Sequence, residues 1–531
     1  MKHWRKWLSF LLLTLLFSGV GHWLAWQFQF LTEEGTFLSS RAMIAGRGDP
    51  ASLQNIGLVY PPLAFYLAVP LTWFFLPHPA IWLSAAWGSA FCLWMRKEFR
   101  TYSFRHRMLG GLVFLLPLQP GIFHSATTGT TFIAFAMLFT IGLYLVARFA
   151  IDQQMLDDTR HQGSMSAWVN SDQYMNERVR YLWSAALCFG IAGFCRFELL
   201  LGLLVFLPIT PLLLPVRERR EIWKMITLAL LLFLPLFATQ FIWTYLTWVF
   251  TDDFFYAFKN PSTYFRQVSS EVLSHSELIL LKGKPLEAIG QVMLMAVIGF
   301  PVYLYLLLRI RNLAVAILFA TPFLVEGLGV ATGLSLMSRS YLAFAGVLSL
   351  VLFLLCAIYR RTGRVETYII GLALILCTAW SWIYFSESPY REERVWKDLV
   401  TGNHEAMIRF ADERRLLTHI RDELEPDELV LMDDQQGYAV IALSNDPDRF
   451  ILPYQKQFVT ALQNPSLLAD AAAYRIPSIV PGLRDRVAER WWLLDRRSVN
   501  AFTESERIGP WYFHQRTFDT AQRPLADSIG F

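Results

Sequence analysis

Charged residues are scarce in this sequence of 531 residues. Only 17% of them are Asp, Glu, Lys or Arg, whereas 54% are hydrophobic and 15% are aromatic. Such a composition is too apolar for an ordinary soluble protein of this size. The formal net charge is only +4, and no long basic run is present that could follow a phosphate backbone. We therefore expect no nucleic-acid partner.

Cysteine is also rare, with five residues in the whole chain. All five lie in apolar segments, none lies in the charged C-terminal part, and their spacing does not match that of metal ligands. The cysteines are Cys92, Cys188, Cys195, Cys356 and Cys377. Neither a disulfide framework nor a zinc site is indicated.

Long apolar runs, in contrast, are abundant. A transmembrane helix needs about 20 apolar residues to cross a bilayer, and about eleven segments approach that length. The first run is too long for a signal peptide and lacks a small-residue cleavage site, so we interpret it as an uncleaved span. The candidate spans are 7–30, 79–95, 108–124, 129–148, 181–195, 199–215, 225–250, 286–308, 312–336, 341–359 and 366–386.

Lys and Arg residues cluster at every second connection between these segments, which is typical of cytoplasmic loops. The N-terminus is therefore predicted to be cytoplasmic and, after an odd number of spans, the C-terminus to lie outside. The apolar run 61–76 would invert this pattern if it crossed the membrane. We expect an interfacial or re-entrant helix there, started by the Pro pair, with a transmembrane helix as the alternative.

The sequence predicts two domains. The predicted fold class is a polytopic α-helical membrane protein with a C-terminal soluble α/β domain. Residues 1–387 form the membrane domain, with outward loops at 31–78 and 251–285, and residues 388–531 form the soluble domain. Within the latter, periodicity predicts a helix over 406–424 and strands over 428–432 and 438–443. Residues 474–480 and 487–494 are further apolar segments of this domain.

Two adjacent glutamates, Glu33 and Glu34, follow the first span directly. Such a pair suits proton abstraction or divalent-metal binding at a membrane surface. The next segment, 37–45, is predicted to be a short amphipathic helix lying on that surface. The simpler alternative is that the two acids only begin a solvated loop.

This loop resembles the first periplasmic loop of GT-C glycosyltransferases, most closely bacterial lipid A aminoarabinose transferases and protein O-mannosyltransferases. The resemblance lies in the acid pair, an aromatic residue three positions on, a Gly-Asp pair at the end of the helix and a Tyr-Pro-Pro-Leu stretch. These residues are Glu33, Glu34, Phe37, Gly48, Asp49, Tyr60, Pro61, Pro62 and Leu63. In the family the pair is usually Asp-Glu, and Lys commonly precedes Pro-Pro.

Two arginines are placed outside by the predicted orientation, against the usual charge bias. Arg196 ends a Gly-containing span, and Arg339 with Tyr341 resembles the start of a late span in the same family. The resemblance implies that both cations hold the phosphate of a polyprenyl-phosphate sugar donor. For Arg196 the structural alternative is an ion pair with Glu198.

The resemblance implies a single displacement in which Glu33 or Glu34 acts on an acceptor hydroxyl of a lipid, a protein or a polysaccharide. No cofactor is required, although the acid pair could bind a divalent metal. The residues expected to line the pocket are Tyr60, Pro61, Pro62, Tyr66, Glu198 and Tyr341. The implied location is a bacterial cytoplasmic membrane, with the soluble domain on the periplasmic side.

Two other functions fit the sequence. A transporter or flippase would also use charged residues within a helix bundle, such as Glu326 in an apolar span. A non-catalytic assembly protein would use its spans as an anchor and its soluble domain to bind a partner. The odd number of spans, the lack of obvious internal repeats and the large external domain count against the transporter.

Overall fold

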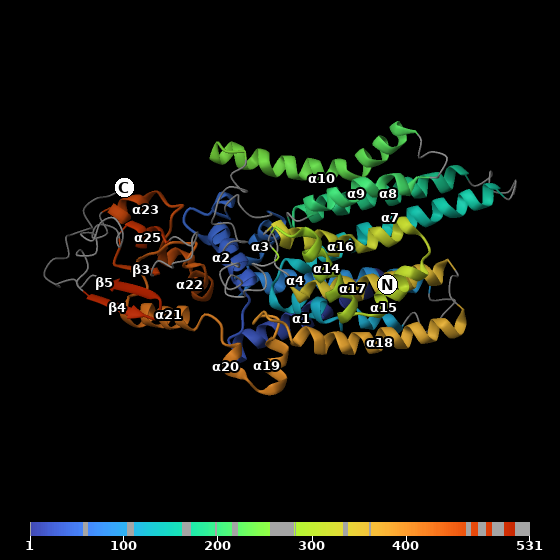
Figure 1. Ribbon diagram of the computed structural model, residues 1–531. Coiled ribbons are helices and arrows are strands. Elements are labelled where there is room, and N and C mark those ends of the chain that lie inside the picture. The colour runs from blue at the N-terminus through green and yellow to red at the C-terminus, as the bar shows by residue number, and fades with distance from the viewer. Residues whose placement is uncertain are drawn as a thin grey trace.

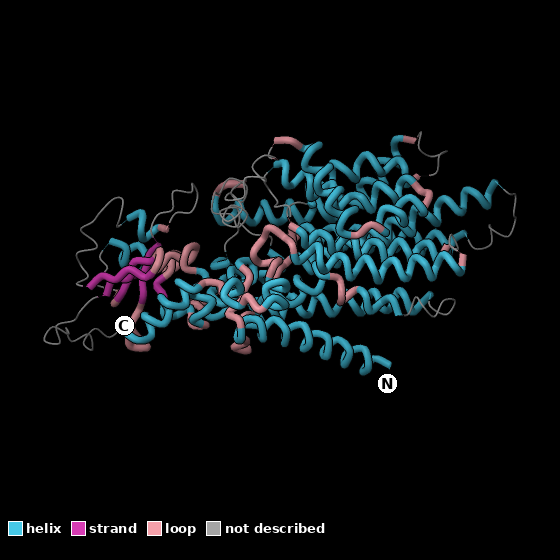
Figure 2. The backbone as a smooth tube through the Cα atoms, turned by 60° about the horizontal axis from the view of Figure 1, so that its bottom comes forward, coloured by secondary structure: helices cyan, strands magenta, loops and turns pink. Residues whose placement is uncertain are grey.

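The computed structural model describes residues 2–56, 62–102, 111–161, 171–196, 199–214, 221–254, 281, 283–332, 338–359, 363–463, 469–475, 485–490 and 504–515. Long helices form an elongated bundle, and a smaller assembly of helices and strands lies at one end of it (Figure 1). The smaller assembly is made by residues after 388, here called the C-terminal region. The first helix runs from the N-terminus toward that end of the bundle (Figure 2).

Within the residues that the structure describes, six helices of the bundle are long and apolar enough to cross a membrane. They are α1 (Lys2–Gln27), α7 (Phe132–His161), α10 (Ile222–Thr251), α16 (Leu313–Thr332), α17 (Leu342–Ile358) and α18 (Arg364–Ser386). A seventh crossing is formed if α14 (Pro285–Gly299) and α15 (Val302–Arg309) act as one span, although the pair bends by 102°. Pro301, which has no amide donor, lies at the bend. The chain is therefore a multi-pass helical membrane protein.

The predicted number of eleven spans is not confirmed. The apolar part of α8 (Ser171–Gly193) and all of α9 (Leu199–Leu213) are shorter apolar helices. In α4 (Pro79–Tyr102) the apolar residues are followed by a charged last third. The predicted span 108–124 is interrupted, because the 3-10 turn η2 (Val113–Leu115) precedes α6 (Pro120–Thr128). Apolar length alone did not separate full crossings from short helices packed within the bundle.

The first predicted outward loop is largely helical. It contains α2 (Glu33–Arg47), the 3-10 turn η1 (Leu53–Ile56) and α3 (Pro62–Thr72). With 11 residues, α3 has about half the length that a span needs, which agrees with the interfacial or re-entrant interpretation. It begins at Pro62, where a missing amide donor costs least.

Helix α2 does not lie on a surface, as the sequence had indicated, but is enclosed on both sides. Every residue from Gly35 to Ala45 is buried. Phe37 packs in one apolar cluster with α3, and Ile44 belongs to the core of the C-terminal region. Figure 1 shows α2 and α3 between the bundle and that region. The amphipathic pattern was that of a helix with two different apolar partners.

The described part of the C-terminal region contains a five-stranded mixed sheet with strand order β2-β1-β3-β5-β4. Strands β1 and β2 and strands β1 and β3 are parallel, whereas β5 is antiparallel to both β3 and β4. The strands are β1 (Val430–Leu431), β2 (Phe450–Ile451), β3 (Ala471–Arg475), β4 (Glu504–Ile508) and β5 (Trp511–Gln515). The helical elements are α19 (Val395–Thr401), α20 (His404–Met407), α21 (Ala411–Glu423), α22 (Tyr438–Ser444), η6 (Pro447–Arg449), α23 (Lys456–Gln463) and α25 (Arg486–Ala488).

One predicted strand of this region is wrong, since residues 438–443 form helix α22. The side chain of Asp433 accepts hydrogen bonds from the backbone amides of Gln435 and Gln436, and Gly437 N donates to Asp433 O. This turn leads directly into a helix. A short apolar run is compatible with either structure, because its periodicity does not distinguish a buried helix from a strand.

Candidate functional site

Glu34 lies at the N-terminus of α2, against the start of α7 and the end of α8. Its Oε1 atom accepts hydrogen bonds from Thr131 N, at 2.9 Å, and from Thr131 Oγ1. Its Oε2 atom is 4.0 Å from Nη2 of Arg196. Thr32, which caps α2, donates to Thr128 O at 2.8 Å and so fixes the helix start to the same turn. The structure thus places Arg196 beside the acid pair.

Glu33 faces the C-terminal region. Its Oε1 atom accepts a hydrogen bond from Arg409 Nη2 at 2.9 Å, and its backbone amide donates to Glu392 Oε1 at 2.6 Å. Arg409 also donates to Glu392, at 3.4 Å. The Glu33 side chain is 22% exposed, compared with 14% for Glu34 and 5% for Arg409. Glu33 is therefore the more accessible carboxylate of the pair.

Arg339 lies in the 3-10 turn η5 (Arg339–Tyr341), at the start of α17. Its guanidinium donates to Tyr384 O and lies 4.3 Å from the centre of the Tyr384 ring. The turn itself is bound by Glu393, which accepts from Arg339 N at 3.2 Å and from Ser340 N and Oγ at 2.9 Å each. Arg339 is thus linked to Glu33 through the neighbouring residues Glu392 and Glu393.

Aromatic rings join the two arginine positions from the bundle side. The guanidinium carbon of Arg196 is 5.5 Å from the centre of the Phe132 ring. The rings of Phe132 and Tyr341 are 5.1 Å apart. Tyr341 is only 1% exposed and belongs to the bundle core. Its ring packs within the bundle beside the site, and its predicted place on the pocket lining stays a prediction.

Two other predicted lining residues lie on α3. Pro62 is buried at its start, and the next residue, Leu63, donates its amide to Phe194 O at 3.2 Å. Because Phe194 precedes Arg196 by two positions in the chain, this contact brings the beginning of α3 close to Arg196. Tyr66 packs against the apolar cluster of Phe37. Tyr60, Pro61 and Glu198 lie outside the described residues.

Most of the predicted outward loop 251–285 also lies outside the described residues, including every position from 255 to 280. At its start, Asp252 ends α10 in a left-handed conformation, with φ of 56°. Among the parts of the chain that the structure describes, no group of three or more His, Cys, Asp or Glu side chains could hold a metal ion.

Four site residues were missed by the sequence analysis: Thr131, Glu392, Glu393 and Arg409. Glu392 and Glu393 form a second adjacent acid pair soon after α18, which ends at Ser386, and this is the same kind of signal that drew attention to Glu33 and Glu34. No comparable signal marks Thr131 or Arg409. Their roles follow only from tertiary contacts between distant segments.

Burial raises the pKa of two tyrosines near the acid pairs. Tyr438 is packed against Phe37, and burial, followed by the nearby Glu33 charge, raises the pKa of its hydroxyl. Burial and the charges of Glu393 and Glu326 raise the pKa of Tyr390. Glu326 is fully buried in α16.

A second group of acids lies within the C-terminal region, and one of them contacts α2. Arg41 of α2 forms a buried ion pair with Asp434, whose neighbour Asp433 follows strand β1. Burial and then the charge of Asp434 raise the pKa of Asp433, while burial and then the charge of Asp433 raise the pKa of Asp485. The carboxylate oxygens of Asp433 and Asp485 accept hydrogen bonds from backbone amides. These bonds indicate a structural role for both acids.

No protein-family model matches this sequence, and its comparison with curated proteins gives no match. Function must therefore be inferred from the chemistry of the site.

Proposed function

We propose that the chain is a GT-C-type membrane glycosyltransferase, which moves a sugar from a polyprenyl-phosphate donor to an acceptor hydroxyl of a lipid, protein or polysaccharide. The observation that supports this proposal best is the position of Arg196 beside Glu34, next to the more exposed Glu33. A cation for a phosphate and a carboxylate for a hydroxyl are the two groups that such a transfer needs.

The two glutamates have different tasks in this mechanism. Glu34 is held by both donors of Thr131 and lies beside Arg196, so it positions that arginine. Glu33 is the more exposed acid and is assigned as the general base. It is the first residue of the pair, like the Asp of the family that the loop resembles.

The reaction is a single displacement at the anomeric carbon of the donor sugar. The acceptor oxygen forms the new glycosidic bond and gives its proton to Glu33. The bond between the anomeric carbon and the phosphate oxygen breaks, and its electron pair leaves with the polyprenyl phosphate. Arg196 and the Arg339 turn stabilise that charge. This chemistry balances without a metal or another cofactor.

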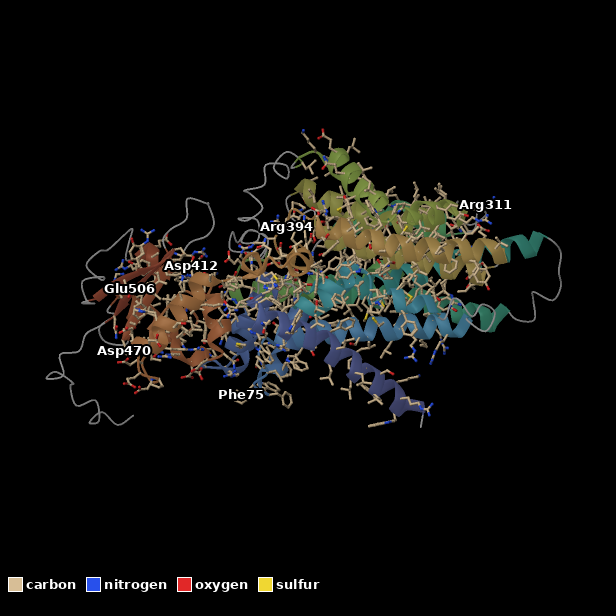
Figure 3. The ribbon with its side chains drawn as sticks, turned by 90° about the horizontal axis from the view of Figure 1, so that it is seen from below. Phe75, Arg311, Arg394, Asp412, Asp470 and Glu506 are labelled. Atoms are coloured by element: carbon tan, nitrogen blue, oxygen red, sulfur yellow. The ribbon has the colours of Figure 1, made fainter. Side chains whose placement is uncertain are left out.

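The proposed orientation puts this site at the extracytoplasmic face of a bacterial cytoplasmic membrane. Arg311 lies at the end of the bundle away from the C-terminal region (Figure 3). The first residues of α1, which are rich in Lys and Arg, also lie away from that region (Figure 1). Both features favour a cytoplasmic location for that end. The C-terminal region and the site would then be periplasmic.

The Glu33→Gln variant tests the enzyme against its alternatives when its expression is matched to the parent. Gln preserves the size of the side chain but removes the base. We expect loss of the glycan product while the lipid-linked donor accumulates on the outer side. Donor trapped on the inner side would instead indicate a flippase, and unchanged product and donor would indicate an anchor or assembly role.

The control is Glu423→Gln, which changes an exposed acid of α21. It should leave both product and donor unchanged. In purified form, the parent should transfer sugar from a polyprenyl-phosphate donor to a hydroxyl acceptor, and failure to do so with every donor tried would contradict the proposal.

A further inference from the structure

Glu33 is contacted by side chains that belong to the C-terminal region rather than to the membrane helices. Arg409 lies in the connection between α20 and α21, and its Nη2 atom is 2.9 Å from Glu33 Oε1. Its own backbone amide donates to Gln29 O at 3.2 Å, just after α1. Both ends of Arg409 are therefore fixed against the segment that carries the proposed base.

Glu392 completes this arrangement from the turn that follows α18. Its Oε1 atom accepts the amide of Glu33 at 2.6 Å, which satisfies a donor at the N-terminus of α2. The same oxygen receives Arg409 Nη2 at 3.4 Å. One guanidinium thus bridges two carboxylates, Glu33 and Glu392, that would otherwise repel each other.

The charged surroundings make Arg409 important for this geometry. Glu34 lies beside Glu33 in the chain, and Glu33, Glu392 and Glu413 are all close enough to Tyr438 for their charges to add to burial in raising the pKa of its hydroxyl. Arg409 is nevertheless only 5% exposed. A buried cation among several carboxylates holds them in place, because removing one partner of such a group leaves buried charge uncompensated.

We infer that Arg409 and Glu392 are positioning residues through which the C-terminal region holds the Glu33 carboxylate at the acceptor hydroxyl. The inference rests on the proposed transferase function. It assigns this region a part in the chemical step itself, so that the active site is completed by two parts of the chain that are far apart in sequence.

Kinetics of Arg409→Gln test the inference in purified full-length protein. A base displaced by about 1 Å costs on the order of 100-fold in rate, so kcat should fall about 100-fold while KM for the lipid donor is unchanged. In the Glu33→Gln background the same change should slow the residual rate little further. Arg409→Lys should restore part of the rate, because the cation returns.

The matched control is Arg415→Gln, which removes an exposed arginine of α21 and should leave kcat and KM unchanged. A rise in KM without loss of kcat in Arg409→Gln would overturn the inference, because it would assign Arg409 to donor binding. Full multiplication of the two losses in the double variant would also overturn it, since Arg409 would then act independently of Glu33.

A thermal double-mutant cycle on Arg409→Gln and Glu33→Gln gives a readout that needs no activity. If the contact holds Glu33, the double variant should lose less melting temperature than the two single losses added together. Strict additivity would overturn the inference even in an active enzyme. Absence of sugar transfer by the parent would instead remove the proposed function, while the cycle still decides whether Arg409 holds Glu33.

Discussion

The Nη2 atom of Arg196 lies 4.0 Å from Oε2 of Glu34, where the start of α2 meets the start of α7 and the end of α8. This separation is longer than a close charge-assisted hydrogen bond, which measures about 2.8 Å. Both side chains are partly exposed, at 16% and 14%. The Arg196 guanidinium therefore lies beside the acid pair with part of its surface open to an incoming phosphate.

Arg196→Gln is predicted to reduce kcat/KM about 100-fold, because it removes the cation that stabilises the leaving phosphate. The measurement is transfer from a polyprenyl-phosphate sugar by the purified variant. Arg311→Gln is the control, since Arg311 is exposed at the opposite end of the bundle (Figure 3). Equal rates for parent and Arg196→Gln would contradict the phosphate role.

Arg41→Met is predicted to lower the free energy of unfolding by about 3 kcal/mol, because it leaves the charge of Asp434 buried without its cation. Both partners are nearly inaccessible, with 5% and 9% exposure. Adding Asp434→Asn should recover part of the loss. By comparison, breaking the exposed Arg415–Asp412 pair by Arg415→Met should cost less than about 1 kcal/mol. Thermal unfolding of all four proteins checks this, and equal losses for Arg41→Met and Arg415→Met would argue against a buried pair.

The buried acids of the C-terminal region predict a pH dependence of stability. The pKa of Asp485 is raised to about 8 and that of Asp433 to about 6, from an unfolded value of 3.8. The folded protein therefore keeps protons that the unfolded chain releases, and this contribution to stability falls as the pH rises from about 4 to about 8. His514, whose pKa burial lowers to about 4, contributes the opposite slope.

The variant Asp485→Asn isolates the acid contribution, because His514 is present in both proteins. Relative to the parent, its melting temperature should improve steadily between pH 4 and pH 8, whatever the absolute cost of the substitution. Asp427→Asn, at an exposed position, should keep a constant offset from the parent. A constant offset for Asp485→Asn as well would show that Asp485 is ionised in the folded protein throughout this range.

Glu393→Gln is predicted to weaken donor binding through the Arg339 turn. The carboxylate accepts from Ser338, Ser340 and Arg339, and Gln offers one acceptor oxygen where Glu offers two. Hydrogen bonds to a charged group are worth about 2 kcal/mol, so KM for the lipid donor should rise several-fold. Glu387→Gln, in an exposed pair with Lys397, is the control. An unchanged KM would exclude the turn from donor binding.

The sequence predicted those features that depend on composition or on local pattern. Apolar length predicted a helical membrane protein, and the acid pair outside the first span led to Glu34, with Arg196 now found beside it. Proline at the first turn predicted the start of α3 at Pro62. Each of these follows from the requirements of a bilayer or a helix end, which act within one segment.

Features that depend on long-range packing were not predictable in the same way. The burial of α2 requires a partner at its Ile44 face, and that partner is folded from residues after 388. Arg409 was overlooked because a lone arginine in a charged segment is ordinary until Glu33 lies opposite it. The helix at Tyr438 was mistaken for a strand because the turn made by Asp433 decides the structure of the residues that follow.

The enclosure of α2 bears on how the protein is made. This helix leaves the ribosome long before the C-terminal region does, and Ile44 finds its apolar neighbours only when that region has folded. Until then its apolar face must rest on lipid or on a chaperone. Chains truncated within the sheet should consequently mature poorly even if every membrane helix inserts correctly.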